Sequence, residues 1–104
     1  MKGEELKGHL DLLLLSALAE GPAHGYLLIE RLRKRSGGAL DLPEGTAYPA
    51  LHRLERDGLL WSAWTTASGR RRRVYSLTRR GRGALARREA EWRRFSHAVE
   101  AVLA

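Results

Sequence analysis

Apolar side chains recur at intervals of three and four residues in the first third of the chain, which is the spacing of one helical face. The first series ends at Gly21-Pro22, a pair that stops a helix. Its members are Leu6, Leu10, Leu13, Leu14, Ala17 and Leu18. A second series begins near His24 and ends at the loop residues 36–38. The pattern therefore predicts two amphipathic helices joined by a short turn.

A third helix is predicted from about Thr46 to Asp57. Its inward positions would be Ala47, Ala50, Leu51 and Leu54. Thr46 would cap the helix, which places Pro49 in the first turn, where its missing N–H costs least. We expect Gly58 to end the helix, because glycine readily adopts the left-handed conformation.

From Leu59 the period changes to the alternation of a β-strand. This strand would turn at residues 67–69 and return from about Arg72 to Leu77. Trp61 and Trp64 point to opposite faces of such a strand, so one of them is predicted to lie in the core. A two-stranded hairpin is not stable alone, and we expect it to lean on the helices.

The last segment is predicted to be one helix capped by Thr78. Its apolar residues follow a heptad pattern, which is typical of a helix that pairs with another helix. The predicted dimer-interface residues are Leu85, Trp92, Phe95, Val99 and Val102, with Leu6 and Leu10 of the first helix. We expect a second copy of the chain to supply the partner helix.

Together these elements predict a mainly α fold with a two-stranded β-wing, a winged helix-turn-helix followed by a C-terminal dimerisation helix. Residues 1–78 would form the winged helix-turn-helix, and residues 79–104 the dimerisation helix. The two parts would make a single structural unit.

Positive charge is concentrated in the second half of the chain. The 104 residues carry a formal net charge of +7, and residues 59–104 hold 11 arginines against 3 glutamates. Such a density of like charge is relieved by a polyanion, so nucleic acid or an acidic membrane surface is the natural partner. The longest apolar run is too short for a membrane span, and the chain has no cysteine, so we expect a cytoplasmic protein without a membrane anchor.

Three parts of the chain carry a recognisable combination of residues. They are His24-Gly25-Tyr26, the continuous string from Gly45 to Leu59, and the residues Gly69, Arg73 to Thr78, and Gly81. In these segments the chain resembles the short type of PadR-family transcriptional regulators. The resemblance covers nearly the whole chain and implies a dimeric regulator that binds double-stranded DNA. Ala47 departs from the larger aliphatic residue usual in the family, and the row of arginines near the wing tip is unusually uniform.

In a helix-turn-helix the second helix enters the major groove, while wing arginines reach phosphates or an adjacent minor groove. The predicted DNA-binding residues are Tyr26, Thr46, Tyr48, Pro49, His52, Arg53, Arg70, Arg71, Arg72, Arg73 and Arg79. Arg70 to Arg73 are expected in the hairpin turn. The alternatives are that Tyr26 and Tyr48 pack in the core, that His24 only caps its helix, and that the arginines are a solvated surface.

Trp92 and Phe95 are candidates for binding a small-molecule effector. The resemblance implies that short family members bind flat aromatic or cationic compounds between their subunits. The alternative is that these two rings only pack in the dimer interface.

Catalysis is not predicted, because the four histidines lack metal-ligand spacing and no nucleophile or phosphate-loop motif occurs. No cofactor or metal is expected. The leading hypothesis is a homodimeric repressor that binds a palindromic operator with half-sites about 10 bp apart. Two alternatives stay open: a protein-interaction module that grips an acidic partner, and a sequence-indifferent architectural or RNA-binding protein.

Overall fold

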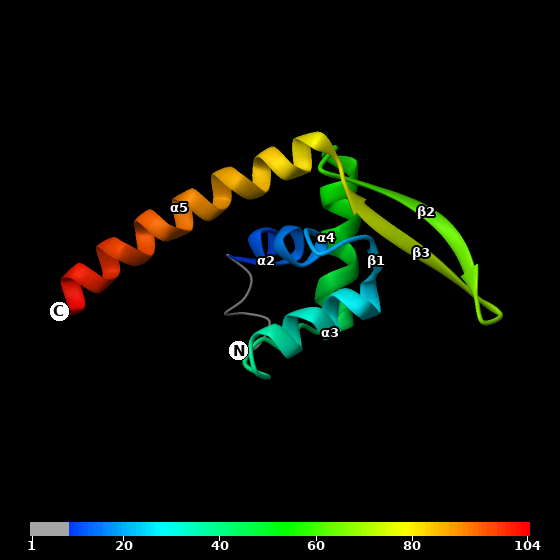
Figure 1. The fold of residues 1–104 in the computed structure, drawn as a ribbon, viewed down its shortest axis with the longest axis horizontal. Helices are drawn as coiled ribbons and strands as arrows, with labels where there is room; N and C mark the ends of the chain where they lie inside the picture. Colours follow the sequence, from blue (N-terminus) through cyan, green and yellow to red (C-terminus); the bar gives the residue numbers. More distant parts are fainter. Residues whose placement is uncertain (1–8) are drawn as a thin grey trace.

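The computed structural model describes residues 9–104, which fold into four helices and three strands. The helices are α2 (Leu10–Leu18), α3 (Gly25–Arg35), α4 (Glu44–Arg56) and α5 (Arg79–Leu103), and the strands are β1 (Ala23–His24), β2 (Leu60–Ala67) and β3 (Arg70–Leu77). Helices α2, α3 and α4 pack together, while the β2–β3 hairpin and α5 extend to opposite sides (Figure 1). This is the predicted winged helix-turn-helix with a projecting C-terminal helix.

The start of α4 differs from the prediction. The helix begins at Glu44 after Pro43, so Thr46 lies in the first turn and is not the cap. The backbone N–H groups of Thr46 and Ala47 donate to the Pro43 carbonyl at 3.0 and 2.9 Å. Pro49 therefore lies in the second turn, where its missing N–H removes a helical hydrogen bond. Gly58 follows the helix with a φ of +81°, as predicted.

The hairpin is longer than predicted because its turn is shorter. Ser68 and Gly69 alone connect the strands, with φ values of +53° and +74°, the geometry of a two-residue turn matched to strand twist. The pairing runs from Leu60 with Leu77 to Ala67 with Arg70. The four arginines at 70–73 therefore lie in β3, which corrects their predicted place in the turn.

A third strand was not predicted. Ala23 pairs with Tyr75 and His24 with Val74, so the sheet has the order β1-β3-β2. This pairing ties the start of α3 directly to the wing.

The core lies among the helices and the base of the sheet. The largest fully buried side chains are Tyr75, Leu14, Leu15, Leu28, Leu51 and Leu54. Trp61 and Trp64 are each 54% exposed, so the prediction that one of them is a core residue is wrong. Trp61 faces away from the buried side of β2, and Trp64 lies on the core side but further out along the wing than the helices reach.

Thr78 caps α5 as predicted: its hydroxyl accepts a hydrogen bond from the Gly81 N–H at 2.9 Å and donates to the Gly58 carbonyl at 2.7 Å. A Cβ at Gly81 would overlap the carbonyl oxygen of Leu59, so this contact requires glycine. Leu85 is only 9% exposed and lies in the core of its own chain, as does Leu10. This burial corrects their predicted place in a dimer interface, and Leu6 lies outside the described residues.

Candidate nucleic-acid interface

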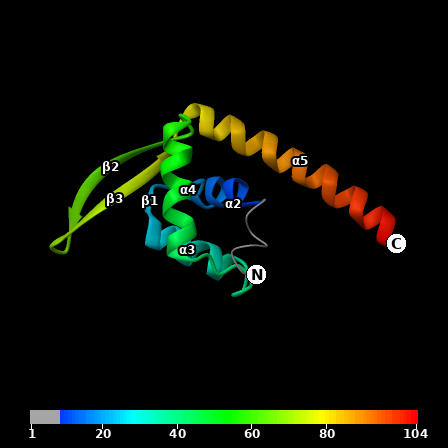
Figure 2. The same cartoon turned by 180° about the vertical axis from the view of Figure 1, so that it is seen from behind.

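The outward face of α4 carries a continuous exposed stripe. Its residues are Gly45, Pro49, His52 and Arg56, at helical spacings of four, three and four. Ala47, Ala50, Leu51 and Leu54 are buried on the opposite face. Seen from behind, α4 crosses in front of α2, between the wing and α5 (Figure 2). Arg56 was absent from the predicted site, although its spacing from His52 could have identified it.

Arg53 does not lie on this stripe, because it is about 100° further round the helix than His52. Its guanidinium donates to both carboxylate oxygens of Asp11, at 2.6 and 3.1 Å. This hydrogen bonding raises the pKa of Arg53. The structure thus assigns Arg53, which was predicted to reach DNA, an ion pair with Asp11 of α2.

Tyr48 lies at the edge of the stripe and is half-buried. Its ring packs so closely against Gly25 that a Cβ there would overlap it. Tyr48 therefore holds α3 against α4, while part of its ring borders the surface described below. Thr46 is half-buried on the other edge of the stripe.

His24 caps α3, in agreement with one of the predicted alternatives. Its Nδ1 accepts a hydrogen bond from the Leu27 N–H at 3.1 Å, which leaves the proton of the neutral ring on Nε2. Burial lowers the pKa of His24, and the charges of Arg72 and Arg31 lower it further. Tyr26 is 53% exposed and stacks on the His24 ring, so the alternative that it packs in the core is wrong.

Two of the wing arginines flank one tryptophan. The guanidinium groups of Arg71 and Arg73 lie 4.9 and 5.7 Å from the Trp64 ring centroid. Arg73 also donates to the Ser62 hydroxyl at 2.7 Å and lies 3.5 Å from Glu55 of α4. Within residues 9–104, Arg70, Arg71 and Arg72 have no carboxylate partner, so their charges remain available to an external anion.

A groove of about 270 Å³ separates α4 from the wing. It is lined by His24, Tyr48, His52, Trp64, Arg71, Arg72, Arg73 and Tyr75. The fold thus brings two α4 residues and three wing arginines of the predicted site to one surface. Tyr26, Arg70 and Arg79 lie outside the lining, although all three are exposed. Cations, ring N–H groups and phenol hydroxyls are the groups that bind a sugar-phosphate strand.

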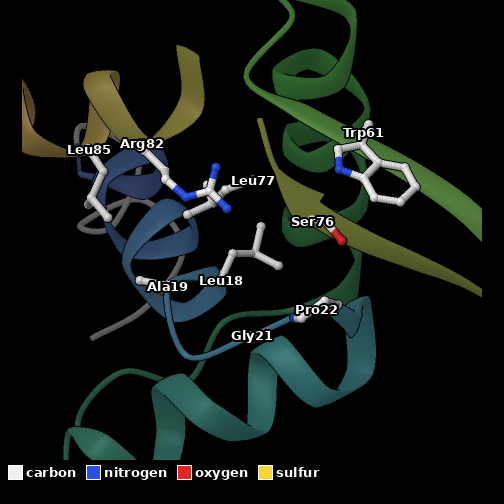
Figure 3. Close-up of a pocket in the computed structure, with 9 residues that line it drawn as sticks. All are labelled: Leu18, Ala19, Gly21, Pro22, Trp61, Ser76, Leu77, Arg82 and Leu85. Carbon is white, nitrogen blue, oxygen red and sulfur yellow. The ribbon is translucent and has the colours of Figure 1, made fainter. Parts of the chain in front are cut away.

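Two other pockets lie away from this groove. One of about 400 Å³ is bordered by the ends of α2 and β3 and the start of α5. Figure 3 shows Arg82 extending into it from α5 and Trp61 on the side of β2. A second of about 350 Å³ lies on α5 against Trp92, Arg93 and His97. Phe95 does not line it, although its ring centroid is 6.2 Å from that of Trp92.

Among residues 9–104, no three histidine, aspartate or glutamate side chains come together as a metal site. Over the same residues, none of the helices combines the length and the apolar character that crossing a bilayer requires.

Comparison with known proteins places this geometry in a family. The family model for PadR-like transcriptional regulators matches residues 14–87. The transcriptional regulator Rv3488 of Mycobacterium tuberculosis is 43% identical over 72 residues, which span 69% of this chain and 64% of that protein. The chain thus spans less than two thirds of the length of this relative.

Solved structures agree with the family match. A transcriptional regulator from Clostridium thermocellum superposes with a TM-score of 0.86 at 26% identity, over 95% of this chain and 97% of that one. A PadR family regulator from Clostridium difficile gives 0.82 at 33% identity, over 92% and 99% of the two chains. These relatives are regulators and not enzymes, in agreement with the prediction. The chain therefore belongs to the PadR-like family of transcriptional regulators.

Proposed function

We propose that this chain is a cytoplasmic, homodimeric repressor that binds a palindromic operator in double-stranded DNA. The observation that carries the proposal is the groove between α4 and the wing. The exposed stripe of α4 borders this groove on one side, and arginines without carboxylate partners border it on the other. An α-helix fits the major groove, and an arginine-rich wing beside it suits the neighbouring phosphates or minor groove.

In this arrangement the stripe residues Pro49, His52 and Arg56 face base edges, and one phosphate strand runs through the groove. The Nε2–H of His24 and the guanidinium of Arg71 are then on the strand's path. Thr46 and Tyr48 flank the stripe and contact the sugar-phosphate backbone. Tyr26 and Arg79 are exposed beyond the groove and reach flanking phosphates.

The exposed apolar side chains of α5 support a homodimer. Trp92, Phe95, Val99 and Val102 are 43, 60, 38 and 84% exposed and repeat at heptad spacing. Large apolar side chains in one row on a projecting helix are the surface that a second copy of the same helix would cover. The two reading helices would then be related by a two-fold axis, which requires a palindromic operator.

The pocket beside Trp92 supports an effector that releases the DNA. It combines an indole with the charges of Glu89 and Arg93, which suits a flat aromatic or cationic compound. Titration of such compounds while DNA binding is measured tests this part. If a Trp92→Ala variant still dimerises and its DNA binding responds to these compounds as the wild type does, the proposal of an effector site at Trp92 is wrong.

Gel shift and footprinting with the DNA that flanks the coding region test the DNA-binding proposal. If each subunit neutralises four or five phosphates, the log-log dependence of affinity on salt has a slope of about −7 to −9. Arg71→Gln should make this slope less negative by about 2 per dimer. Arg94→Gln removes the same charge from an exposed position on α5 that does not line the groove, and it should leave the salt slope unchanged.

A palindromic footprint is the expected result. Uniform weak protection of any duplex would instead indicate a sequence-indifferent protein. A salt slope near zero, with no protected site, would contradict DNA binding and favour an acidic protein partner.

A further inference from the structure

Within residues 9–104, ion pairs, ring contacts and close packing fix one face of α5 to the rest of the chain along its first half. Gly81 lies against the Leu59 carbonyl, and Leu85 is in the core. One turn further, Arg88 lies 3.6 Å from Asp11. Two turns beyond Leu85, Trp92 makes an edge-to-face contact with His9 at 5.1 Å between ring centroids. Beyond Trp92, the ion pairs and ring contacts of α5 within residues 9–104 stay inside α5.

Asp11 is shared between two arginines from two different helices. Its carboxylate accepts two hydrogen bonds from Arg53 of α4, and Arg88 of α5 approaches the same carboxylate. The Asp11 side chain is only 16% exposed, so both guanidinium groups compensate a charge that is largely removed from water. Arg53 is the neighbour of His52 on the proposed reading helix. Asp11 therefore joins the helix that reads DNA to the helix that joins the subunits.

We propose that Asp11 is a positioning residue that fixes the angle between α4 and α5 and thereby sets the spacing of the half-sites that the dimer accepts. This inference rests on the proposed function. The core contacts of Gly81 and Leu85 hold the beginning of α5. The Asp11–Arg88 pair acts further from this anchor, as does the His9–Trp92 ring contact one turn beyond it, and a contact far from the anchor resists a swing of the helix more effectively.

The dimensions of α5 make a small swing significant. From Arg88 to Leu103 the helix rises about 22 Å, so a rotation of about 10° at Arg88 moves its end by about 4 Å. One base-pair step along the duplex is about 3.4 Å. If loss of the Asp11 contacts allows α5 to rotate by this angle, the dimer can also bind half-sites whose spacing is one base pair longer or shorter.

Selection of binding sites from a library of random duplexes tests the proposal. The wild-type chain is expected to select paired half-sites at one spacing, by about tenfold over a spacing one base pair longer or shorter. Asp11→Asn keeps the shape of the side chain and removes its charge. It should reduce the preference to about threefold or less while the sequence of each half-site stays the same. The control variant is Arg87→Gln, which removes a neighbouring charge that has no carboxylate partner within residues 9–104. This variant should select the same half-site spacing as the wild type.

Arg88→Gln provides a second test if Asp11→Asn does not fold, because Arg88 is exposed and its loss leaves Arg53 paired. The inference is overturned if both variants keep the wild-type preference. It is also overturned if they lose affinity for a single half-site without any change in spacing, since Asp11 would then act on α4 alone. A wild-type chain that binds DNA at any spacing overturns the inference and leaves DNA binding intact. One that selects no DNA overturns the proposed function as well.

Discussion

The guanidinium of Arg73 lies 3.5 Å from the carboxylate of Glu55, and the Ser62 hydroxyl bridges the two residues. This contact joins the wing to α4 at the mouth of the proposed DNA groove. It also partly neutralises one of the four wing arginines, so Glu55 competes with a phosphate for Arg73.

Glu55→Gln is therefore expected to strengthen binding to DNA of any sequence. Releasing Arg73 adds about one phosphate contact per subunit, which makes the salt slope more negative by about 2 per dimer. The free energy of unfolding should fall by at most about 1 kcal/mol, because the ion pair is partly exposed. Gel shifts over a salt series measure the slope. The control is Glu30→Gln, which breaks an exposed ion pair with Arg33 on α3 and should leave the salt slope unchanged.

His52 and Arg53 are adjacent in sequence but should respond oppositely to substitution. His52→Ala removes a stripe residue and should weaken operator binding by about tenfold without changing the melting temperature. Arg53→Met should instead lower the free energy of unfolding by about 1 kcal/mol, because Asp11 loses two hydrogen bonds. Thermal melts and gel shifts of both variants separate the roles. The assignment fails if Arg53→Met leaves stability unchanged and abolishes base preference.

The cap at His24 should make stability depend on pH. Its folded-state pKa lies below the ordinary value of 6.5, chiefly through burial and then through Arg72 and Arg31. The unfolded chain thus takes up the proton at a higher pH than the folded chain. The stability due to neutral His24 is present above pH 6.5 and is lost as the pH falls through the lowered pKa.

Urea unfolding on both sides of this range measures the effect. His24→Asn keeps a capping side chain that does not titrate, so its unfolding free energy should depend less on pH. An identical pH dependence in the two proteins would show that His24 is not responsible.

Two glycines of α5 should have opposite effects on stability. Gly81→Ala places a Cβ against the Leu59 carbonyl and should destabilise the fold by about 1–3 kcal/mol. Gly83→Ala meets only the flexible end of Arg87 and should stabilise the helix by up to about 1 kcal/mol. Denaturant unfolding of both variants checks this pair. Equal effects would contradict the close approach of α5 to the Leu59 carbonyl in the connection between α4 and β2.

The proposed dimer predicts that one face of α5 is sensitive to charge. Val99→Asp would bury a carboxylate between the two subunits and should shift the chain to a monomer. Ala101→Asp introduces the same charge on the opposite side of the helix and should leave the dimer intact. Sedimentation at micromolar concentration distinguishes these states. A Val99→Asp dimer of wild-type affinity would contradict pairing through this row.

Local patterns were sufficient to predict much of the fold. The leucine periodicity located α2 and α3, Thr78 located the start of α5, and Gly58 located the end of α4. These signals are reliable because a helical face and its caps involve residues within four positions of one another.

The sequence by itself thus determined the fold class, the order of the elements and the concentration of arginine that favours a polyanionic partner. Only the tertiary structure decided that Arg53 pairs with Asp11, that β1 exists, and that the tryptophans of β2 stay outside the core. Each of these depends on partners far away in the chain or on how far the helices extend beside the wing. No local pattern of apolar and polar residues records such distances.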